Sequence, residues 1–303
     1  MSQDLPLVSI VTPVLNMGNF VEETIRSVLS QDYPNLEYIV MDGGSTDGTL
    51  EILEKYRGRL SYCSGPDRGT ADAINRGFER SAGSFFGFLN ADDSYLPGAI
   101  SAAVRHLVAE PALGAVYGDG NWVDETGRVI RPYPVQPFDP DLFRKECFIC
   151  QPASLMRREA FELAGRMDPG VRGFDYDLWI RIARVYPMRK IDGVLANSRM
   201  HLGAKTLGQR KAMLEDALDV IRSHYGYVPF SQIHAYASYL ADRRDQFFEP
   251  LRPSFTKYLL SLPVGLRYNA RHPFRFFREW ARVLTLAGFL RRARALSRRD
   301  PGL

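Results

Sequence analysis

The chain has 303 residues, of which 45% are hydrophobic and 24% are charged, a composition typical of a globular protein with a sizeable core. Its net charge of +4 is uneven, because ten arginines but only two acidic residues lie between positions 267 and 300. The sequence shows no apolar run near the roughly 18 residues that span a bilayer, no secretory signal pattern at its start, and an odd number of cysteines. We therefore expect a cytoplasmic protein with reduced thiols.

The first ninety residues alternate strand and helix patterns. Apolar, β-branched runs predict strands, and amphipathic stretches after polar turns predict helices. In chain order the predicted elements are a strand at 7–14, a helix at 21–31, a strand at 36–43, a helix ending at 56, a strand at 60–64, a helix at 70–80 and a strand at 84–90. Strands and helices in this order form βαβ units, so we predict an α/β fold with a mostly parallel central sheet.

The pattern changes after residue 110. A hairpin is predicted at 114–130, closed around residues 125–127, and helices are predicted near 157–164 and 177–185. From residue 229 onward the pattern is helical, with breaks expected at Pro250, Pro253, Pro263 and Pro273. We predict two domains, an α/β domain at 1–227 and a helical, basic, amphipathic extension at 228–303.

Polar side chains recur at or near the carboxyl ends of the predicted strands, where an open parallel sheet binds its ligands. They are Asp42, Asp67, Asn90, Asp92, Asp93, Asp175 and Asp177. Carboxylates at such an edge can hold a divalent cation that neutralises a leaving diphosphate. A further carboxylate can accept the proton of an attacking hydroxyl.

Each of these acids also has a purely structural interpretation. An aspartate before glycine, such as Asp42, is common in turns. Asp92 and Asp93 can cap the helix that follows them. Asp175 and Asp177 can be first-turn carboxylates that the helix dipole favours. Their joint placement at one edge of one predicted sheet favours a shared ligand site.

In this order the motifs resemble those of the family 2 glycosyltransferases with the GT-A fold, over about residues 7–225. The opening strand of that family resembles VSIVTPVLN, and its nucleotide-binding turn resembles VMDGGSTDGT. The central block and metal motif resemble GPDRGTADAINRGFERSAGSFFGFLNADDSYLPG. The acceptor segment and catalytic loop resemble CQPASLMRREAFELAGRMD and GFDYDLWIRIA, and the likeness is greatest to bacterial members that build surface polysaccharides.

The resemblance implies a role for each matching residue. Nucleotide-sugar binding is implied for Thr12, Val14, Asn16, Asp42, Asp67, Arg68, Asn90 and Ala91, metal binding for Asp92 and His201, general-base catalysis for Asp175, and contact with the acceptor for Gln151, Asp177 and Trp179. Within the first group Asp42 would bond the base, and Arg68 could also face the pyrophosphate.

Two departures from the family pattern matter. Asn90 stands where the family's Asp-X-Asp motif has its first acid, which leaves the metal with one anionic ligand fewer. Phe174 stands where the catalytic pair usually has glutamate, so Asp177 remains a rival to Asp175 as the base. A lone histidine such as His201 is also often a packed residue rather than a ligand.

Cys147 and Cys150 form a Cys-x-x-Cys motif. A zinc ribbon needs two such pairs, and only Cys63 is left over. A redox role would need a thioredoxin-like setting, which the surrounding pattern lacks. We therefore interpret the pair as buried, inert thiols.

The basic C-terminal region has an amphipathic helical pattern. A helix beginning at Pro273 would repeat apolar residues at spacings of three and four, with arginines on another face: Phe274, Phe277, Ala281, Leu284 and Gly288 beside Trp280, against Arg275, Arg278 and Arg282. This pattern suits a membrane interface, and it also suits a helix packed on the α/β domain with a solvated charged face. No nucleic-acid recognition motif accompanies the charge.

The function implied by the resemblance is inverting glycosyl transfer from a nucleotide diphosphate sugar, most simply a UDP-sugar, to an acceptor hydroxyl, with Mn²⁺ or Mg²⁺ as cofactor. The acceptor would be a glycan or lipid-linked glycan in surface polysaccharide synthesis, and the protein would be peripheral on the inner face of the cell membrane. The departures at Asn90 and Phe174 suggest a catalytically silent nucleotide-binding scaffold as one alternative. The other is a sugar-phosphate nucleotidyltransferase, for which the sequence has no glycine-rich, lysine-bearing opening loop.

Overall fold

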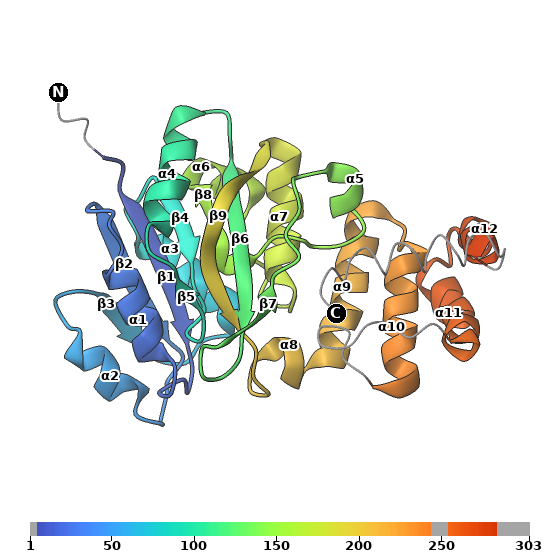
Figure 1. The fold of residues 1–303 in the computed structure, drawn as a ribbon, viewed down its shortest axis with the longest axis horizontal. Coiled ribbons are helices and arrows are strands. Elements are labelled where there is room, and N and C mark those ends of the chain that lie inside the picture. Colours follow the sequence, from blue (N-terminus) through green and yellow to red (C-terminus); the bar gives the residue numbers. More distant parts are fainter. Residues whose placement is uncertain (1–4, 244–253, 284–303) are drawn as a thin grey trace. The chain divides into compact units, whose positions relative to one another are not determined.

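The computed structural model describes residues 5–243 and 254–283, which fall into two compact units. The first unit comprises residues 5–143 and 147–208 and contains the sheet, whereas the second comprises 144–146 and the described residues after 208 and is helical (Figure 1). The domain boundary at residue 227 stays a prediction, since the compact units divide between Gly208 and Gln209.

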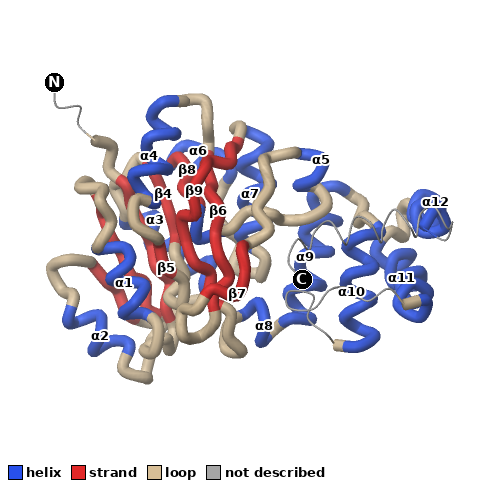
Figure 2. The backbone as a smooth tube through the Cα atoms, viewed as in Figure 1, coloured by secondary structure: helices blue, strands red, loops and turns tan. Residues whose placement is uncertain are grey.

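In the described part of the chain, one mixed sheet of nine strands forms in the order β3-β2-β1-β4-β8-β6-β9-β5, with β7 paired to β6 (Figure 2). The four strands predicted in the first ninety residues are parallel neighbours: β1 (Val8–Val14), β2 (Leu36–Asp42), β3 (Ser61–Ser64) and β4 (Phe85–Phe88). The remaining strands are β5 (Ser94–Tyr95), β6 (Ala115–Val123), β7 (Val129–Pro132), β8 (Ser154–Arg157) and β9 (Met188–Arg199). β6 and β7 form the predicted hairpin, and β6 and β9 are parallel, whereas β8 is antiparallel to both of its neighbours.

Helices cover both faces of this sheet. The helices of the first unit are α1 (Val21–Leu29), α2 (Thr49–Lys55), α3 (Thr70–Arg80), α4 (Ala99–Ala109), α5 (Pro140–Phe143), a 3₁₀ turn η1 (Gln151–Ala153), α6 (Arg158–Ala164), α7 (Phe174–Val185) and α8 (Lys205–Gly208). Ile10 of β1 joins the core that includes the apolar faces of α1 and α4. The next residue, Val11, faces α3, where a Cβ on Gly77 would lie 2.5 Å from its Cγ1. Burial on both faces explains why β1, β2 and β4 are nearly continuous apolar runs, whereas β3 lies at the exposed edge of the sheet.

The second unit consists of α9 (Arg210–Tyr225), α10 (Phe230–Asp242), α11 (Phe255–Tyr268) and α12 (Pro273–Val283). Pro273 begins α12 as predicted, but the break expected at Pro263 is wrong, because Pro263 lies inside α11. A proline removes one helix hydrogen bond. Packing on either side of Pro263 offsets that loss: the ring of Tyr258 stacks on Trp280 of α12 at 4.5 Å, and Gly265 lies against Phe276. Pro250 and Pro253 lie outside the described residues.

The apolar face of α12 differs from the predicted one. Phe276 and Trp280 are buried, whereas Phe274 and Phe277, which the predicted face contained, are exposed. Leu284 and Gly288 lie outside the described residues. The helix is therefore anchored by one pair of aromatic side chains and displays another.

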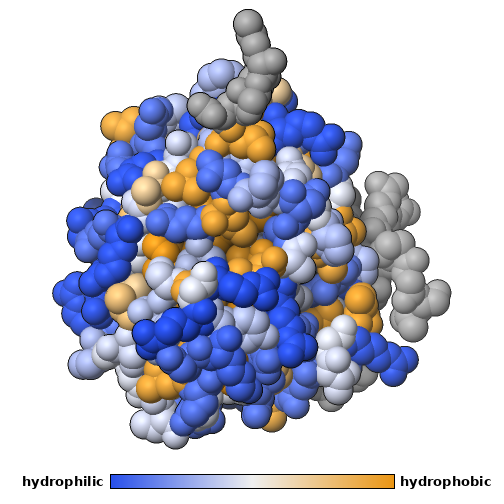
Figure 3. Space-filling view, turned by 90° about the vertical axis from the view of Figure 1, so that its left-hand side faces the viewer, coloured by the Kyte–Doolittle hydropathy of each residue, from blue (hydrophilic) through white to orange (hydrophobic). Residues whose placement is uncertain are grey.

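No helix within the two described ranges is long and apolar enough to cross a bilayer. Figure 3 views the molecule from the side on which Figure 1 shows α2 and β3. On this face hydrophobic side chains gather towards the middle and hydrophilic ones surround them. This side of the first unit thus presents a mixed surface.

Candidate functional site

The loops that follow β1 and β2 are held together by side-chain hydrogen bonds. The backbone N–H of Asn16 donates to Ser45 Oγ (2.8 Å), and its Oδ1 accepts the N–H of Thr46 (2.9 Å). The N–H of Gly18 donates to Asp47 Oδ2 (2.9 Å). Asn16 has a positive φ of 52°, a conformation that asparagine tolerates better than most residues. The carboxyl ends of two neighbouring strands therefore carry one braced pair of loops.

Asp42 is buried at the end of β2 and organises the turn that follows it. Its Oδ2 accepts the N–H groups of Gly44 (3.0 Å) and Ser45 (3.1 Å) and the hydroxyl of Ser64 at the end of β3 (2.5 Å). Asp42 thus has the structural role in a turn that its place before a glycine indicates. A carboxylate has about four acceptor positions, so these three donors leave room for a further one, such as an N–H of a nucleotide base.

Asp67 lies beside this turn. Its Oδ1 accepts the N–H of Gly69 (2.7 Å), and a Cβ on Gly43 would lie 3.0 Å from its Oδ2. The neighbouring Arg68 is exposed and pairs with Asp72 in the first turn of α3 (Nη2 to Oδ1, 2.8 Å). Asp67 therefore faces the Asp42 turn, while Arg68 is held along α3.

Thr12, Val14 and Ala91 are buried side chains. The hydroxyl of Thr12 is 3.0 Å from the hydroxyl of Tyr38, and Val14 and Ala91 belong to the hydrophobic core. Burial raises the pKa of Tyr38 well above its ordinary value, which keeps this phenol neutral. These buried side chains thus pack beneath the loops at the carboxyl ends of β1 and β4.

Asp92 and His201 are brought together across 109 residues of sequence. His201 Nε2 lies 3.0 Å from Asp92 Oδ2, and both side chains are largely buried. The ring of Phe20, just before α1, lies 4.8 Å from the imidazole of His201. The pair offers one oxygen and one nitrogen ligand at the carboxyl edge of the sheet.

Asn90 and Gln151 lie behind this pair. The amide of Asn90 donates to Asp93 Oδ2 (3.2 Å) and to Gln151 Oε1 (3.3 Å), and the amide of Gln151 donates to the Phe88 carbonyl (2.6 Å). Burial and the neighbouring charge of Asp92 raise the pKa of Asp93. An acid in place of Asn90 would add a third carboxylate to this turn. Asparagine instead donates a hydrogen bond there, which gives a physical reason for the departure from the family motif.

Asp175 and Asp177 lie in the first turn of α7, which begins at Phe174. Asp177 Oδ2 accepts two hydrogen bonds from Arg181, from Nη2 at 2.7 Å and from Nε at 2.9 Å. Trp179 is fully buried. Asp177 is thus engaged within its own helix, and Trp179 can influence an acceptor only through packing.

Lys205, which sequence reasoning missed, is close enough to two of the predicted acids for their charges to act on it. Its Nζ donates to Thr70 Oγ1 (2.5 Å) and lies 5.8 Å from the centre of the Phe174 ring. Partial burial lowers the pKa of Lys205, and the negative charges of Asp175 and Asp67 oppose that effect. The one available signal was its place four residues after His201 in RMHLGAKT.

These observations relate several of the predicted residues to one another along one edge of the first unit. His201 lies in the loop after β9 and contacts one acid, whereas Lys205, four residues later, begins α8 and is influenced by two more. We call the connected set the edge cluster: Asp42, Asp67, Asp92, Asp175, His201 and Lys205. It combines acceptors for a base, a pair suited to a cation, and an acid with a nearby ammonium group.

The edge cluster could hold a metal ion only together with a bound diphosphate that supplies further coordinating oxygens. Among the described residues, no group of three or more histidine, cysteine, aspartate and glutamate side chains is placed to hold a metal ion. Asp92 and His201 supply two donors. That is sufficient for Mn²⁺ or Mg²⁺ when diphosphate oxygens and water complete the coordination.

The cysteines take no part in the edge cluster. Cys150 is buried, and burial raises the pKa of its thiol, as expected for an inert residue. The prediction of a buried pair is wrong for Cys147, which is only half-buried because it precedes the buried segment at 148–150, and Cys63 is exposed.

A family model described as Glycosyl transferase family 2 matches residues 9–164 of the chain. An uncharacterized glycosyltransferase of Rickettsia felis is 32% identical over 209 residues, which are 65% of this chain and 34% of that protein. Chondroitin synthase of Escherichia coli is 26% identical over 201 residues, which are 65% of this chain and 29% of that protein. The chain thus aligns with about a third of the length of these curated relatives.

Solved structures share the fold at low sequence identity. S. aureus TarS 1–349 in complex with UDP-GlcNAc has a TM-score of 0.60 and 15% identity, covering 90% of this chain and 83% of that one. The mannosyltransferase PcManGT of Pyrobaculum calidifontis, in complex with GDP-Man and Mn²⁺, has a TM-score of 0.57 and 20% identity, covering 98% of this chain and 81% of that one. The GT-A architecture expected from the sequence is therefore confirmed.

Proposed function

The chain belongs to glycosyl transferase family 2, and on that premise we propose that it is an inverting enzyme that moves a sugar from a UDP-sugar to an acceptor hydroxyl. The observation that supports this proposal most directly is the edge cluster, which gathers residues for base binding, charge neutralisation and proton transfer at one edge of the sheet. S. aureus TarS, which has the same fold, was solved with UDP-GlcNAc, and this favours a uridine nucleotide.

The proposed reaction is a single displacement. The acceptor oxygen attacks the anomeric carbon, its proton passes to the Asp175 carboxylate, and the bond between the sugar and the diphosphate breaks as the nucleoside diphosphate departs. Asp175 is preferred to Asp177 because its position matches that of the catalytic aspartate in the family motif, and Asp177 pairs with Arg181. A divalent cation held by Asp92 and His201 would neutralise the leaving diphosphate. Lys205 can hold further negative charge beside the base.

A thermal-shift panel tests the donor assignment. We expect UDP with Mn²⁺ to raise the unfolding temperature by about 5 °C, since a ligand at 100 times its Kd stabilises by about 2.7 kcal/mol. GDP and ATP with Mn²⁺ serve as matched nucleotide controls. No shift with any nucleotide would contradict the proposal. Binding of a UDP-sugar without transfer or hydrolysis would favour the silent scaffold, and release of pyrophosphate from a nucleoside triphosphate would favour a nucleotidyltransferase.

We also propose that the second unit touches an anionic membrane surface, where a lipid-linked acceptor would lie. Phe274 and Phe277 of α12 are 83% and 49% exposed, although phenylalanine is usually buried. Arg275 and Arg278 beside them are exposed as well. Exposed aromatic and arginine side chains on one short helix suit the interface between lipid headgroups and acyl chains.

Vesicle co-sedimentation tests this contact. We expect the Phe274→Ser/Phe277→Ser double variant to bind phosphatidylserine vesicles about 10- to 100-fold more weakly than the unaltered chain, since each buried phenylalanine contributes about 1.5–3 kcal/mol and insertion is partial. Val108→Ser, which removes an exposed apolar side chain from the first unit, is the matched control and should bind normally. Equal binding by the double variant would contradict the proposal.

A further inference from the structure

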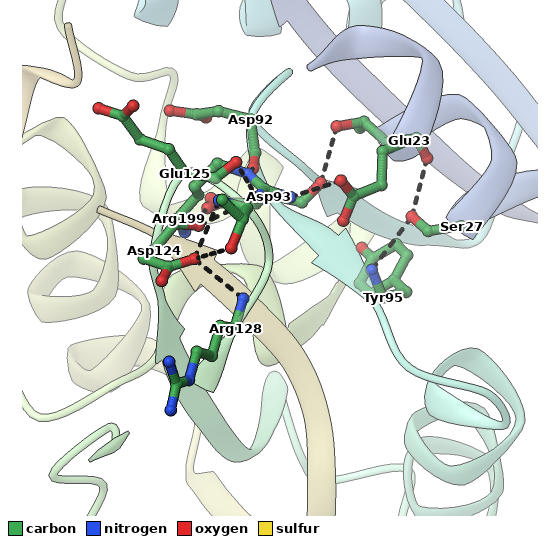
Figure 4. A network of polar contacts seen from close by, with 11 residues as sticks. Glu23, Ser27, Asp92, Asp93, Tyr95, Asp124, Glu125, Arg128 and Arg199 are labelled. Atoms are coloured by element: carbon green, nitrogen blue, oxygen red, sulfur yellow. Dashed lines mark hydrogen bonds and ion pairs between the residues drawn. The ribbon is translucent and has the colours of Figure 1, made fainter. Parts of the chain in front are cut away.

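Arg199, the last residue of β9, is a buried cation to which the family resemblance assigns no role. Its side chain is only 2% exposed. It contacts three segments that are far apart in the sequence: residues 92–93, residues 124–125 in the turn between β6 and β7, and the start of α1 (Figure 4). A buried guanidinium beside the proposed cation ligands calls for an explanation.

The first set of contacts fixes backbone positions around the edge cluster. Nε donates to the carbonyl of Asp92 (2.9 Å), and Nη1 donates to the carbonyls of Asp124 (3.1 Å) and Glu125 (3.0 Å). The backbone N–H of Arg199 donates to Asp93 Oδ1 (2.8 Å). One side chain therefore joins the turn that carries Asp92 to the turn of the hairpin.

The second set of contacts joins both turns to α1. Nη2 pairs with Glu23 Oε2 at 2.6 Å, and the guanidinium carbon lies 5.2 Å from the centre of the Phe20 ring. The same ring contacts His201 at 4.8 Å. The Phe20 ring thus contacts both the Arg199 guanidinium and the His201 imidazole. A change at Arg199 can therefore reach His201 through this ring.

The pattern of acceptors distinguishes orientation from simple charge pairing. The guanidinium contacts one carboxylate, that of Glu23, which is 54% exposed, and three neutral backbone carbonyls. Arginine presents five N–H donors in a rigid planar fork, whereas the three donors of lysine share one nitrogen. Only the fork can reach acceptors in these separate directions at once.

We propose that Arg199 is a positioning residue for the reaction: by holding the carbonyls of Asp92, Asp124 and Glu125, it aims the Asp92 carboxylate at His201 and keeps the hairpin turn beside it. Figure 4 shows the side chains of Asp92 and Glu125 extending to the same side of this network. The inference rests on the proposed function, because it assigns a purpose to the geometry of the proposed cation ligands.

The test compares Arg199→Lys and Arg199→Gln with Arg128→Ala. Arg128 is a matched control because it lies in the same hairpin turn, its side chain is exposed, and its contact to Asp124 Oδ1 uses the backbone N–H that alanine retains. Figure 4 shows the Arg128 guanidinium pointing away from Arg199. Binding of Mn²⁺ in the presence of UDP is measured by electron paramagnetic resonance of the free ion, which needs no turnover.

We expect both Arg199 variants to bind Mn²⁺ at least about tenfold more weakly, the loss typical of residues that orient a metal ligand. Hydrogen exchange at residues 92–93 and 124–128 should become faster in the same variants, with or without Mn²⁺. Arg128→Ala should match the unaltered chain in both measurements.

The outcomes separate this inference from the proposed function. Unchanged Mn²⁺ affinity in a folded Arg199→Lys chain would overturn the positioning role alone. Absence of Mn²⁺ binding with UDP in the unaltered chain would overturn both proposals. If the Arg199 variants do not fold, Glu23→Gln, which removes the exposed ionic partner and leaves the three carbonyl contacts in place, should bind Mn²⁺ within about twofold of the unaltered chain. A loss of about tenfold or more in this variant would mean that charge pairing with Glu23 carries the effect, and would overturn the inference.

Discussion

Asp175→Asn is expected to lower kcat by about 10²–10⁴-fold, the range that a well-placed general base contributes. The amide is close in size to the carboxylate but cannot take up the acceptor proton. Donor binding should change little, because the proposed donor contacts come from other members of the edge cluster. The measurement is initial-rate kinetics with a UDP-sugar, together with thermal-shift titration of UDP and Mn²⁺.

Asp177→Asn is the matched control for this prediction. It removes the charge that Arg181 pairs with, so its main effect should be a loss of stability of about 1–3 kcal/mol, with a much smaller fall in kcat. If the folded Asp177→Asn chain lost turnover while Asp175→Asn kept it, the two roles would have to be exchanged.

Removal of the divalent cation is expected to have an effect of similar size. EDTA should abolish transfer, and Mn²⁺ or Mg²⁺ should restore it. Asp92→Ala should lower kcat/KM by about 10²–10³-fold even at saturating metal, since neutralising a leaving diphosphate is worth several kcal/mol and each 1.4 kcal/mol is tenfold in rate. His201→Gln should shift the metal concentration needed for half-maximal activity.

The control for the metal prediction is Asp119→Asn. Asp119 pairs with Lys190 at 2.8 Å and does not belong to the edge cluster, so the loss of its charge should leave the metal response unchanged. Full activity of the unaltered chain in EDTA would contradict the assignment of Asp92 and His201 as cation ligands.

The sequence predicts the part of the fold in which strands and helices that follow one another in the chain also pack together. The strands and helices of the first ninety residues form where apolar runs and polar turns predicted them, and α3 has the predicted bounds. β9 was missed because its MRKIDGVLANSR sequence has no regular alternation, and its parallel partner β6 lies about seventy residues earlier. Pairing over such a distance leaves no local signal.

The candidate site was likewise predictable only in part. Acids at strand ends were visible because turns and strands mark those positions, and the Asp177–Arg181 pair has the i,i+4 spacing that a helix brings together. Lys205 and Arg199 were not visible as site residues. Lys205 meets Thr70 across 135 residues, and Arg199 meets Asp92 across 107. Only the assembled sheet places these cations next to the acids.

The shared contact of one phenyl ring with both an arginine and a histidine has an evolutionary consequence. Positions 20, 23, 199 and 201 form a unit whose members support one another, although nearly the whole first unit separates the earlier two from the later two. A replacement at one of them changes the surroundings of the others, so single substitutions should be poorly tolerated there. In an alignment of relatives, the residues at these four positions should therefore change together.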